Sequence, residues 1–187
     1  MTATAQVDRS KELENRQKFL IEIIKRYDSY ISSANAKIAV VLSYSMAYMG
    51  GVAFKIIDLS AKRTQDCIWW IAIGVAGASV IATLYAVFRA YEALNPQTPS
   101  GRAQHEDPSI IFFGDVSSLT GGRDGYVMRI NEICDEEIVE DLARQAHVLA
   151  CIVTKKMSTL NKAIQALAMW QLPLSLLAIF FLCLTSF

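Results

Sequence analysis

The chain has little of what most soluble enzymes and metal proteins need. Its four cysteines lie far apart without a C-x-x-C pair, and only two histidines accompany them, so we predict no metal site and no cofactor. The sequence holds no G-x-S-x-G elbow, no Walker loop and no H-E-x-x-H motif, and we predict that the protein is not an enzyme. Its formal net charge is +0, so it lacks the basic excess typical of nucleic-acid-binding domains.

Apolar residues, by contrast, are abundant and gathered in blocks. Hydrophobic residues make up 53% of the chain and charged residues 19%. Three apolar runs, at residues 37–57, 67–88 and 167–187, reach the length of about 20 residues that crosses a bilayer. The second and third runs contain no charged residue. We therefore predict an all-α integral membrane protein with three transmembrane helices, with the lipid bilayer as a partner.

Basic residues indicate how these spans are oriented. They gather before the first run and between the second and third, whereas the turn at residues 58–66 holds only Lys62 and Arg63. The positive-inside rule therefore places the N-terminus and residues 89–166 in the cytoplasm, and the short turn outside.

Two long amphipathic helices are predicted on the cytoplasmic side, at residues 1–36 and 126–166, because apolar residues recur along each at spacings of three and four, apart from a gap at Gln17. The first stripe consists of Leu13, Leu20, Ile24, Tyr27, Ile31, Ala34 and Ile38. The second consists of Ile138, Leu142, Ala146, Leu149, Val153, Met157, Leu160, Ile164 and Leu167. Each stripe continues into a span, which predicts a helical stalk that packs on itself or within a homo-oligomer. A surface lying flat on lipid is the alternative.

Inside the spans, the polar and small residues are informative. Small residues recur every four positions, which favours close helix approach, at Ala47, Gly51, Gly74, Ala78, Ala82 and Ala86. Gln171 is a polar group that needs a partner in the bundle, and Pro173 is expected to kink the third span. No charged residue lies near a span centre, which argues against a proton-coupled transporter or a voltage sensor.

Residues 89–125 combine a proline-containing linker with the stretch SIIFFGDVSSLTGGRDGY. One reading of this stretch is a turn with a hydrophobic anchor. The other is an anion-binding corner, in which glycine N–H groups, the next helix N-terminus, Arg123 and Arg129 hold a phosphate while Phe112 and Phe113 face a base. The acidic cluster at residues 135–141 is interpreted as a solvated face near a helix N-terminus rather than a metal site.

Three stretches resemble the transmembrane effector family of the Pycsar anti-phage defence systems. In SANAKIAVVLSYSMAYMGGV, the tetrapeptide Asn35-Ala36-Lys37-Ile38 stands where the family prefers Asp-x-Lys-Ala. DPSIIFFGDVSSL is similar to the family's apolar-Phe-Gly segment, and DLARQAHVLACIVTKKMSTLNKAIQAL is similar to its helix before the final span. The resemblance covers residues 18–187 and keeps the order of elements throughout.

This resemblance implies an effector of the bacterial inner membrane that responds to cyclic CMP or cyclic UMP, made by a partner cyclase after phage infection. It implies that the nucleotide makes the effector oligomerise or rearrange, so that membrane integrity is lost and the cell stops growing or dies. The predicted ligand-binding residues are Arg123 and Arg129 for the phosphate, Phe112, Phe113 and Asp115 near the base, and Lys155 and Lys156 as second candidates. Coupling or structural roles are predicted for Asn35, Lys37, Gly114, Gln171 and Pro173.

Two other functions fit the same features. One is a related few-span conflict effector that senses another cyclic nucleotide or depends on an associated sensor protein. The other is a membrane scaffold whose stalk recruits a cytoplasmic partner without any nucleotide.

Overall fold

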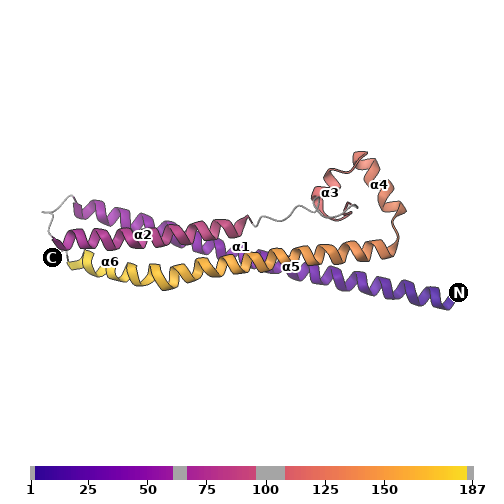
Figure 1. Cartoon of the computed structure of the whole chain (residues 1–187), viewed down its shortest axis with the longest axis horizontal. Helices are drawn as coiled ribbons and strands as arrows, with labels where there is room; N and C mark the ends of the chain where they lie inside the picture. The colour runs from indigo at the N-terminus through magenta and orange to yellow at the C-terminus, as the bar shows by residue number, and fades with distance from the viewer. Residues whose placement is uncertain (1–2, 61–66, 96–107, 185–187) are drawn as a thin grey trace. The chain divides into compact units, whose positions relative to one another are not determined.

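The computed structural model describes residues 3–60, 67–95 and 108–184, and every regular element within these ranges is helical (Figure 1). This confirms the all-α prediction. The elements in chain order are α1 (Ala3–Ser60), α2 (Cys67–Leu94), α3 (Phe113–Ser117), α4 (Gly122–Glu132), α5 (Asp135–Ala166), the π-helical turn η2 (Leu167–Gln171) and α6 (Leu172–Leu184). Most of the predicted external turn at 58–66, part of the linker at 89–125 and the last residues of the third predicted span lie outside the described residues.

Three helical stretches of the described chain are long and apolar enough to cross a membrane: Asp8–Asp58, Cys67–Leu94 and Asp135–Cys183. The first two contain the predicted runs at 37–57 and 67–88, and the third covers residues 167–183 of the run at 167–187, so the prediction of three candidate spans is confirmed. The helix expected before the first span also continues into it without a break, since α1 is a single helix of 58 residues.

The chain divides into two compact units. The first unit comprises Met1–Ser32 and Gln97–Thr154, and the second unit comprises Ser33–Pro96 and Lys155–Phe187. Helices α1 and α5 each contribute residues to both units. The second unit contains all three apolar runs predicted as spans.

In the second unit, α1, α2 and α5 meet in a core built mostly from small side chains. Its buried residues are Ala34, Ile38 and Val41 of α1, Ala90 and Ala93 of α2, and Leu160 and Ala163 of α5. Helix α2 also packs against η2 and α6 (Figure 1), and Ala72 near its start lies against Leu182 near the end of α6. Because alanine lets helix backbones approach closely, these helices gain dispersion contacts that do not depend on excluding water.

The face of α2 that packs differs from the one expected from small-residue spacing. Its buried residues recur at spacings of three and four: Ala72, Ala76, Ser79, Thr83, Ala86, Ala90 and Ala93. Of the predicted series, Gly74 and Ala78 are exposed on the chain, Ala82 is half-buried and only Ala86 is buried. Within this chain the four-residue series does not follow the packed face, because a strict four-residue spacing drifts around a helix of 3.6 residues per turn, whereas alternating three and four follows one face.

The two predicted amphipathic stripes are largely confirmed, with one exception in α5. Along both helices the stripe residues are buried or partly buried, but Ile164 is 41% exposed while Ala163 beside it is fully buried. The smaller residue takes the inward position where α5 approaches α1 and α2 closely.

The single helix predicted over residues 126–166 is in fact two helices. Helix α4 ends at Glu132, Ile133 adopts an extended conformation (φ −72°, ψ 140°), and α5 begins at Asp135. The first turn of α5 contains Asp135, Glu136 and Glu137. Carboxylates in that position stabilise a helix N-terminus, so these three residues lie as predicted near a helix start. Asp141 of the same cluster is buried, so the prediction of a solvated face was wrong for that residue.

The glycine-rich stretch before α4 is required by backbone geometry. Gly121 has φ +88°, which an L-residue rarely adopts, and it caps the N-terminus of α4. At Gly125, an added Cβ would lie 2.3 Å from the carbonyl oxygen of Thr120. Close packing of the turn therefore accounts for these two glycines without a bound anion.

Candidate functional site

The segment that enters α3 is held to α5 by the side chain of Ser109. Its Oγ donates a hydrogen bond to Asp141 Oδ2 (2.9 Å) and accepts one from Gln145 Nε2 (3.0 Å). The same Oγ accepts from the backbone N–H groups of Ile111 and Phe112, which turns the chain into α3. One serine thus ties a local turn to a helix more than thirty residues further along the chain.

Two further contacts complete this anchor. Asp141 Oδ2 also accepts from the backbone N–H of Ile110 (3.0 Å), and Tyr126 of α4 donates from its hydroxyl to the Ile110 carbonyl (2.9 Å). Ile110 and Asp141 are 8% and 7% exposed. Because a buried carboxylate without partners is costly, Asp141 specifies where this segment lies on α5. The segment is therefore an anchored turn, as one reading predicted, but only Ile110 is a buried apolar anchor: the other contacts are hydrogen bonds, and Ile111 and Phe113 are exposed.

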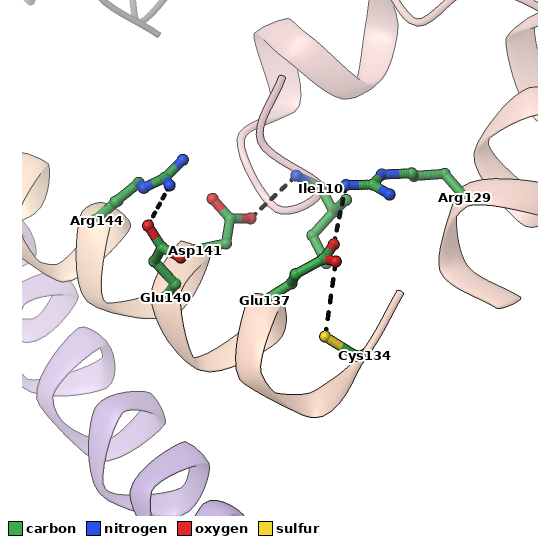
Figure 2. Close-up of polar contacts among 7 residues, drawn as sticks. All are labelled: Ile110, Arg129, Cys134, Glu137, Glu140, Asp141 and Arg144. Carbon is green, nitrogen blue, oxygen red and sulfur yellow. Dashed lines mark hydrogen bonds and ion pairs between the residues drawn. The ribbon is translucent and has the colours of Figure 1, made fainter. Parts of the chain in front are cut away.

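Next to the anchor is a cavity of about 380 Å³ (Figure 2). Its walls come from the anchored segment, the end of α4, Ile133 and the first part of α5. The lining residues are Pro108, Ile110, Arg129, Ile133, Glu137, Glu140, Asp141 and Arg144. All of them belong to the first unit.

The cavity holds charges of both signs. Arg129 of α4 pairs with Glu137 of α5 (3.1 Å), and Arg144 pairs with Glu140 one turn before it on α5. Figure 2 shows Arg129 reaching Glu137 from another helix and Arg144 beside Glu140 on α5, and Cys134 donates to Glu137 (3.6 Å). The arginine side chains are each 39% exposed, so these ion pairs are in contact with solvent and contribute little to stability. They can exchange partners without a large loss of folding free energy.

The structure separates the predicted ligand-binding residues. Arg129 lines the cavity, whereas Arg123 is exposed in the first turn of α4 and is not among the lining residues. Phe112 and Phe113 pack against each other with ring centroids 4.8 Å apart, and Phe113 is 80% exposed. Asp115 accepts from the backbone N–H of Ser109 (3.1 Å) and so supports the anchored turn.

Lys155 and Lys156 have different environments because neighbouring residues on a helix point in different directions. Lys155 is exposed, whereas Lys156 is only 4% exposed. Lys156 lies in the second unit, before the third predicted span, and its Nζ donates to Asn35 Oδ1 (2.5 Å). Burial lowers the pKa of Lys156. Asn35, the position at which the chain departs from the expected Asp, is thus the hydrogen-bond partner of a buried lysine, and Lys37 is exposed.

The remaining predicted residues are Gly114, Gln171 and Pro173. An added Cβ at Gly114 would lie 2.6 Å from the ring of Phe112, so a larger residue there would require that ring to shift. Gln171 ends the π-helical turn and is fully buried, and its Oε1 accepts from Tyr44 of α1 (3.1 Å). The predicted partner of Gln171 in the bundle is therefore found. Pro173 follows two residues later, and the helix before it is widened to the π form.

Sequence patterns did not indicate Ser109, Asp141, Gln145 or Arg144 as parts of a site. Three of these residues lie in one helical stretch, DLARQ, at spacings of three and four along α5. A polar row beside the apolar stripe was the available signal, but it does not identify a partner across more than thirty residues of chain. Within the described ranges, no group of three or more histidine, cysteine or acidic side chains is arranged to hold a metal ion.

The helices and the site define an α-helical membrane protein with three candidate spans and a separate unit that carries a charged cavity. The chain belongs to the Pycsar effector protein domain family, whose model matches residues 19–184. It is 21% identical over 161 residues to the Pycsar effector protein EcPycTM of Escherichia coli, covering 85% of each chain. No solved structure matches it. Membership in this family implies an anti-phage effector role.

Proposed function

We propose that this protein is an inner-membrane effector that binds a cyclic pyrimidine nucleotide, cyclic CMP or cyclic UMP, and then disrupts the membrane. Membership in the Pycsar effector family over residues 19–184 carries this proposal. Three helices long and apolar enough to cross a membrane support it. The nucleotide would come from a cyclase that is linked to the effector only through the diffusible messenger.

We place the ligand in the cavity of the first unit. Arg129 and Arg144 approach it from two different helices, so a cyclic phosphate between them would replace Glu137 and Glu140 as their partner. The displaced carboxylates can then accept hydrogen bonds from the ribose hydroxyl or from an amino group of the base. Arg123 lies outside the cavity lining, so we assign the phosphate to Arg129 and Arg144 rather than to Arg123 and Arg129.

Nucleotide binding at the cavity can affect the second unit through helix α5. Four of the cavity residues lie on α5, which also contributes residues to the core of the second unit through Leu160 and Ala163. A nucleotide that binds one arrangement of α4 and α5 more tightly than another shifts the population between them. Rearrangement or oligomerisation of the spans would follow because α5, η2 and α6 form one helical stretch, Asp135–Cys183.

Calorimetric titration of the full-length protein in detergent with a panel of cyclic mononucleotides and cyclic oligonucleotides tests this proposal. Arg129→Ala and Arg144→Ala should each lower the affinity for the active nucleotide about tenfold or more. Arg16→Ala is the matched control, because Arg16 pairs with Glu12 on α1 and takes no part in the cavity. Affinity unchanged in the double variant Arg129→Ala/Arg144→Ala would remove this site.

Release of an entrapped dye from vesicles that contain the protein tests the second half of the proposal. Cyclic CMP or cyclic UMP should cause release, and an unrelated cyclic nucleotide should not. If only a cyclic oligonucleotide causes release, the activating ligand is a cyclic oligonucleotide and not a cyclic pyrimidine mononucleotide. Absence of release with every nucleotide, together with absence of binding, would favour a scaffold.

A further inference from the structure

The second unit contains a polar seam among its apolar helices, formed by Tyr44, Tyr48, Ser79 and Gln171, which runs from the buried Ser79 and Gln171 to Tyr44, 40% exposed on the chain. Gln171 and Ser79 are fully buried. Tyr44 donates to Gln171 Oε1 (3.1 Å), and Tyr48 lies 2.6 Å from Ser79 Oγ. The two tyrosines are one turn apart on α1, with stacked rings 6.4 Å between centroids. The seam thus joins η2, α1 and α2.

The hydrogens of the seam can be assigned from its contacts. Ser79 Oγ donates its one hydrogen to the Ala76 carbonyl (2.7 Å), so Tyr48 must be the donor in the contact with Ser79. The hydrogens of both tyrosines and of Ser79 are therefore all used. Gln171 differs, because its Nε2 has no hydrogen-bond partner among the described residues.

An unpartnered amide is expensive in this environment. Two N–H donors without an acceptor in an apolar interior cost about 1–3 kcal/mol or more. Gln171 ends a π turn in which the backbone N–H of Leu172 donates to the Leu167 carbonyl. π turns of this kind are frequent at functional positions in helices. Nonetheless the chain places an amide here rather than a leucine.

We propose that this seam binds water within the membrane part and lines the route by which small ions cross when the effector acts. Water supplies the acceptor that Gln171 Nε2 needs, and the lone pairs of the tyrosine hydroxyls offer further positions along the seam. The spans have no charged residue near their centres, so this row of neutral polar groups is the part of the second unit best suited to hold water. The second half of this inference rests on the proposed function, because it assumes that the effector makes the membrane permeable.

Water access can be measured without any nucleotide. Gln171→Cys and Leu172→Cys are introduced one at a time into full-length protein whose four cysteines are replaced by alanine, and each variant is reconstituted into phosphatidylethanolamine–phosphatidylglycerol vesicles. A membrane-impermeant methanethiosulfonate is present on both faces. Leu172 is next in sequence to Gln171 and is 46% exposed on the chain, so it should face lipid. Because only a hydrated thiol ionises and reacts, Gln171→Cys should react about tenfold faster than Leu172→Cys. Equal or slower reaction overturns the proposal.

A second pair of variants keeps the test valid if Gln171→Cys does not fold. Ser79→Cys is nearly isosteric and lies on the seam, and Ala78→Cys beside it is exposed on the chain. The same difference in rate is expected, and its absence overturns the water site.

Dye or ion release then tests the route. Gln171→Leu should reduce nucleotide-triggered release about tenfold, whereas Met169→Leu, at a 73% exposed position of the same turn, should leave it unchanged. Undiminished release in Gln171→Leu would show that ions cross elsewhere. Absence of release in the wild-type protein counts against the proposed function, while the thiol reaction rates decide the seam separately.

Discussion

Removing the side chain of Asn35 should expose the cost of burying the charge of Lys156. Lys156 is 4% exposed and its Nζ donates to Asn35 Oδ1 over 2.5 Å. A hydrogen bond to a charged group contributes about 1.5–3 kcal/mol. Asn35 itself is exposed, so water reaches one side of this contact. We therefore expect Asn35→Ala to lower the free energy of unfolding by about 1.5 kcal/mol, at the lower end of that range. For a chain of this length, that loss corresponds to a fall in Tm of about 3–6 °C.

The opposite change should stabilise the protein. Asn35→Asp places a carboxylate beside the buried ammonium and turns the contact into an ion pair, which should raise Tm. Lys156→Met keeps the buried stem and removes the charge, and combining it with Asn35→Ala should cost less than the two single losses added together. Asn161→Ala and Lys162→Met are matched controls at exposed positions of α5.

Thermal unfolding of the purified protein in detergent, followed by circular dichroism, measures these effects. Burial lowers the pKa of Lys156, so the unfolded chain binds more protons than the folded chain at alkaline pH below the ordinary lysine value of 10.5. Stability relative to Lys156→Met should therefore rise with pH in that range. Additive losses in the double variant, or no change in Tm for Asn35→Asp, would refute the assignment of Asn35 as the partner that stabilises Lys156.

Three further outcomes are expected. Gly125→Ala should destabilise the protein by about 1–3 kcal/mol, because the new Cβ meets the Thr120 carbonyl, whereas Gly77→Ala, with nothing within 4 Å of its Cβ, should show no such loss in Tm. Ser109→Ala should cost about 1–3 kcal/mol and speed amide hydrogen exchange across residues 109–117, while Ser118→Ala at an exposed position should do neither. Glu137→Gln should leave Tm nearly unchanged but strengthen nucleotide binding by about two- to fivefold, since it removes the carboxylate that competes for Arg129; weaker binding would contradict the phosphate position.

The long helices of this protein were predictable from the sequence alone. Runs of apolar residues need no partner to form helices in a membrane, because each backbone group must bond within its own segment there. The stripes along α1 and α5 were predictable for a related reason, since residues three and four apart share a helix face whatever packs against it. The acidic residues at the start of α5 likewise act on their own helix end.

Tertiary structure decided the contacts on which the site depends. Ser109 and Asp141 are 32 positions apart, and Asn35 and Lys156 are 121 apart. No local preference of these side chains selects such partners. Sequence reasoning also treated Lys155 and Lys156 alike, although only the packing of α5 determines which of the two is buried. Local sequence patterns determine where helices form, because the interactions that stabilise a helix join residues only a few positions apart. Pairing across the chain depends on how those elements meet, and only the folded arrangement brings Arg129 and Arg144 to one cavity and leaves the amide of Gln171 unpartnered among apolar helices.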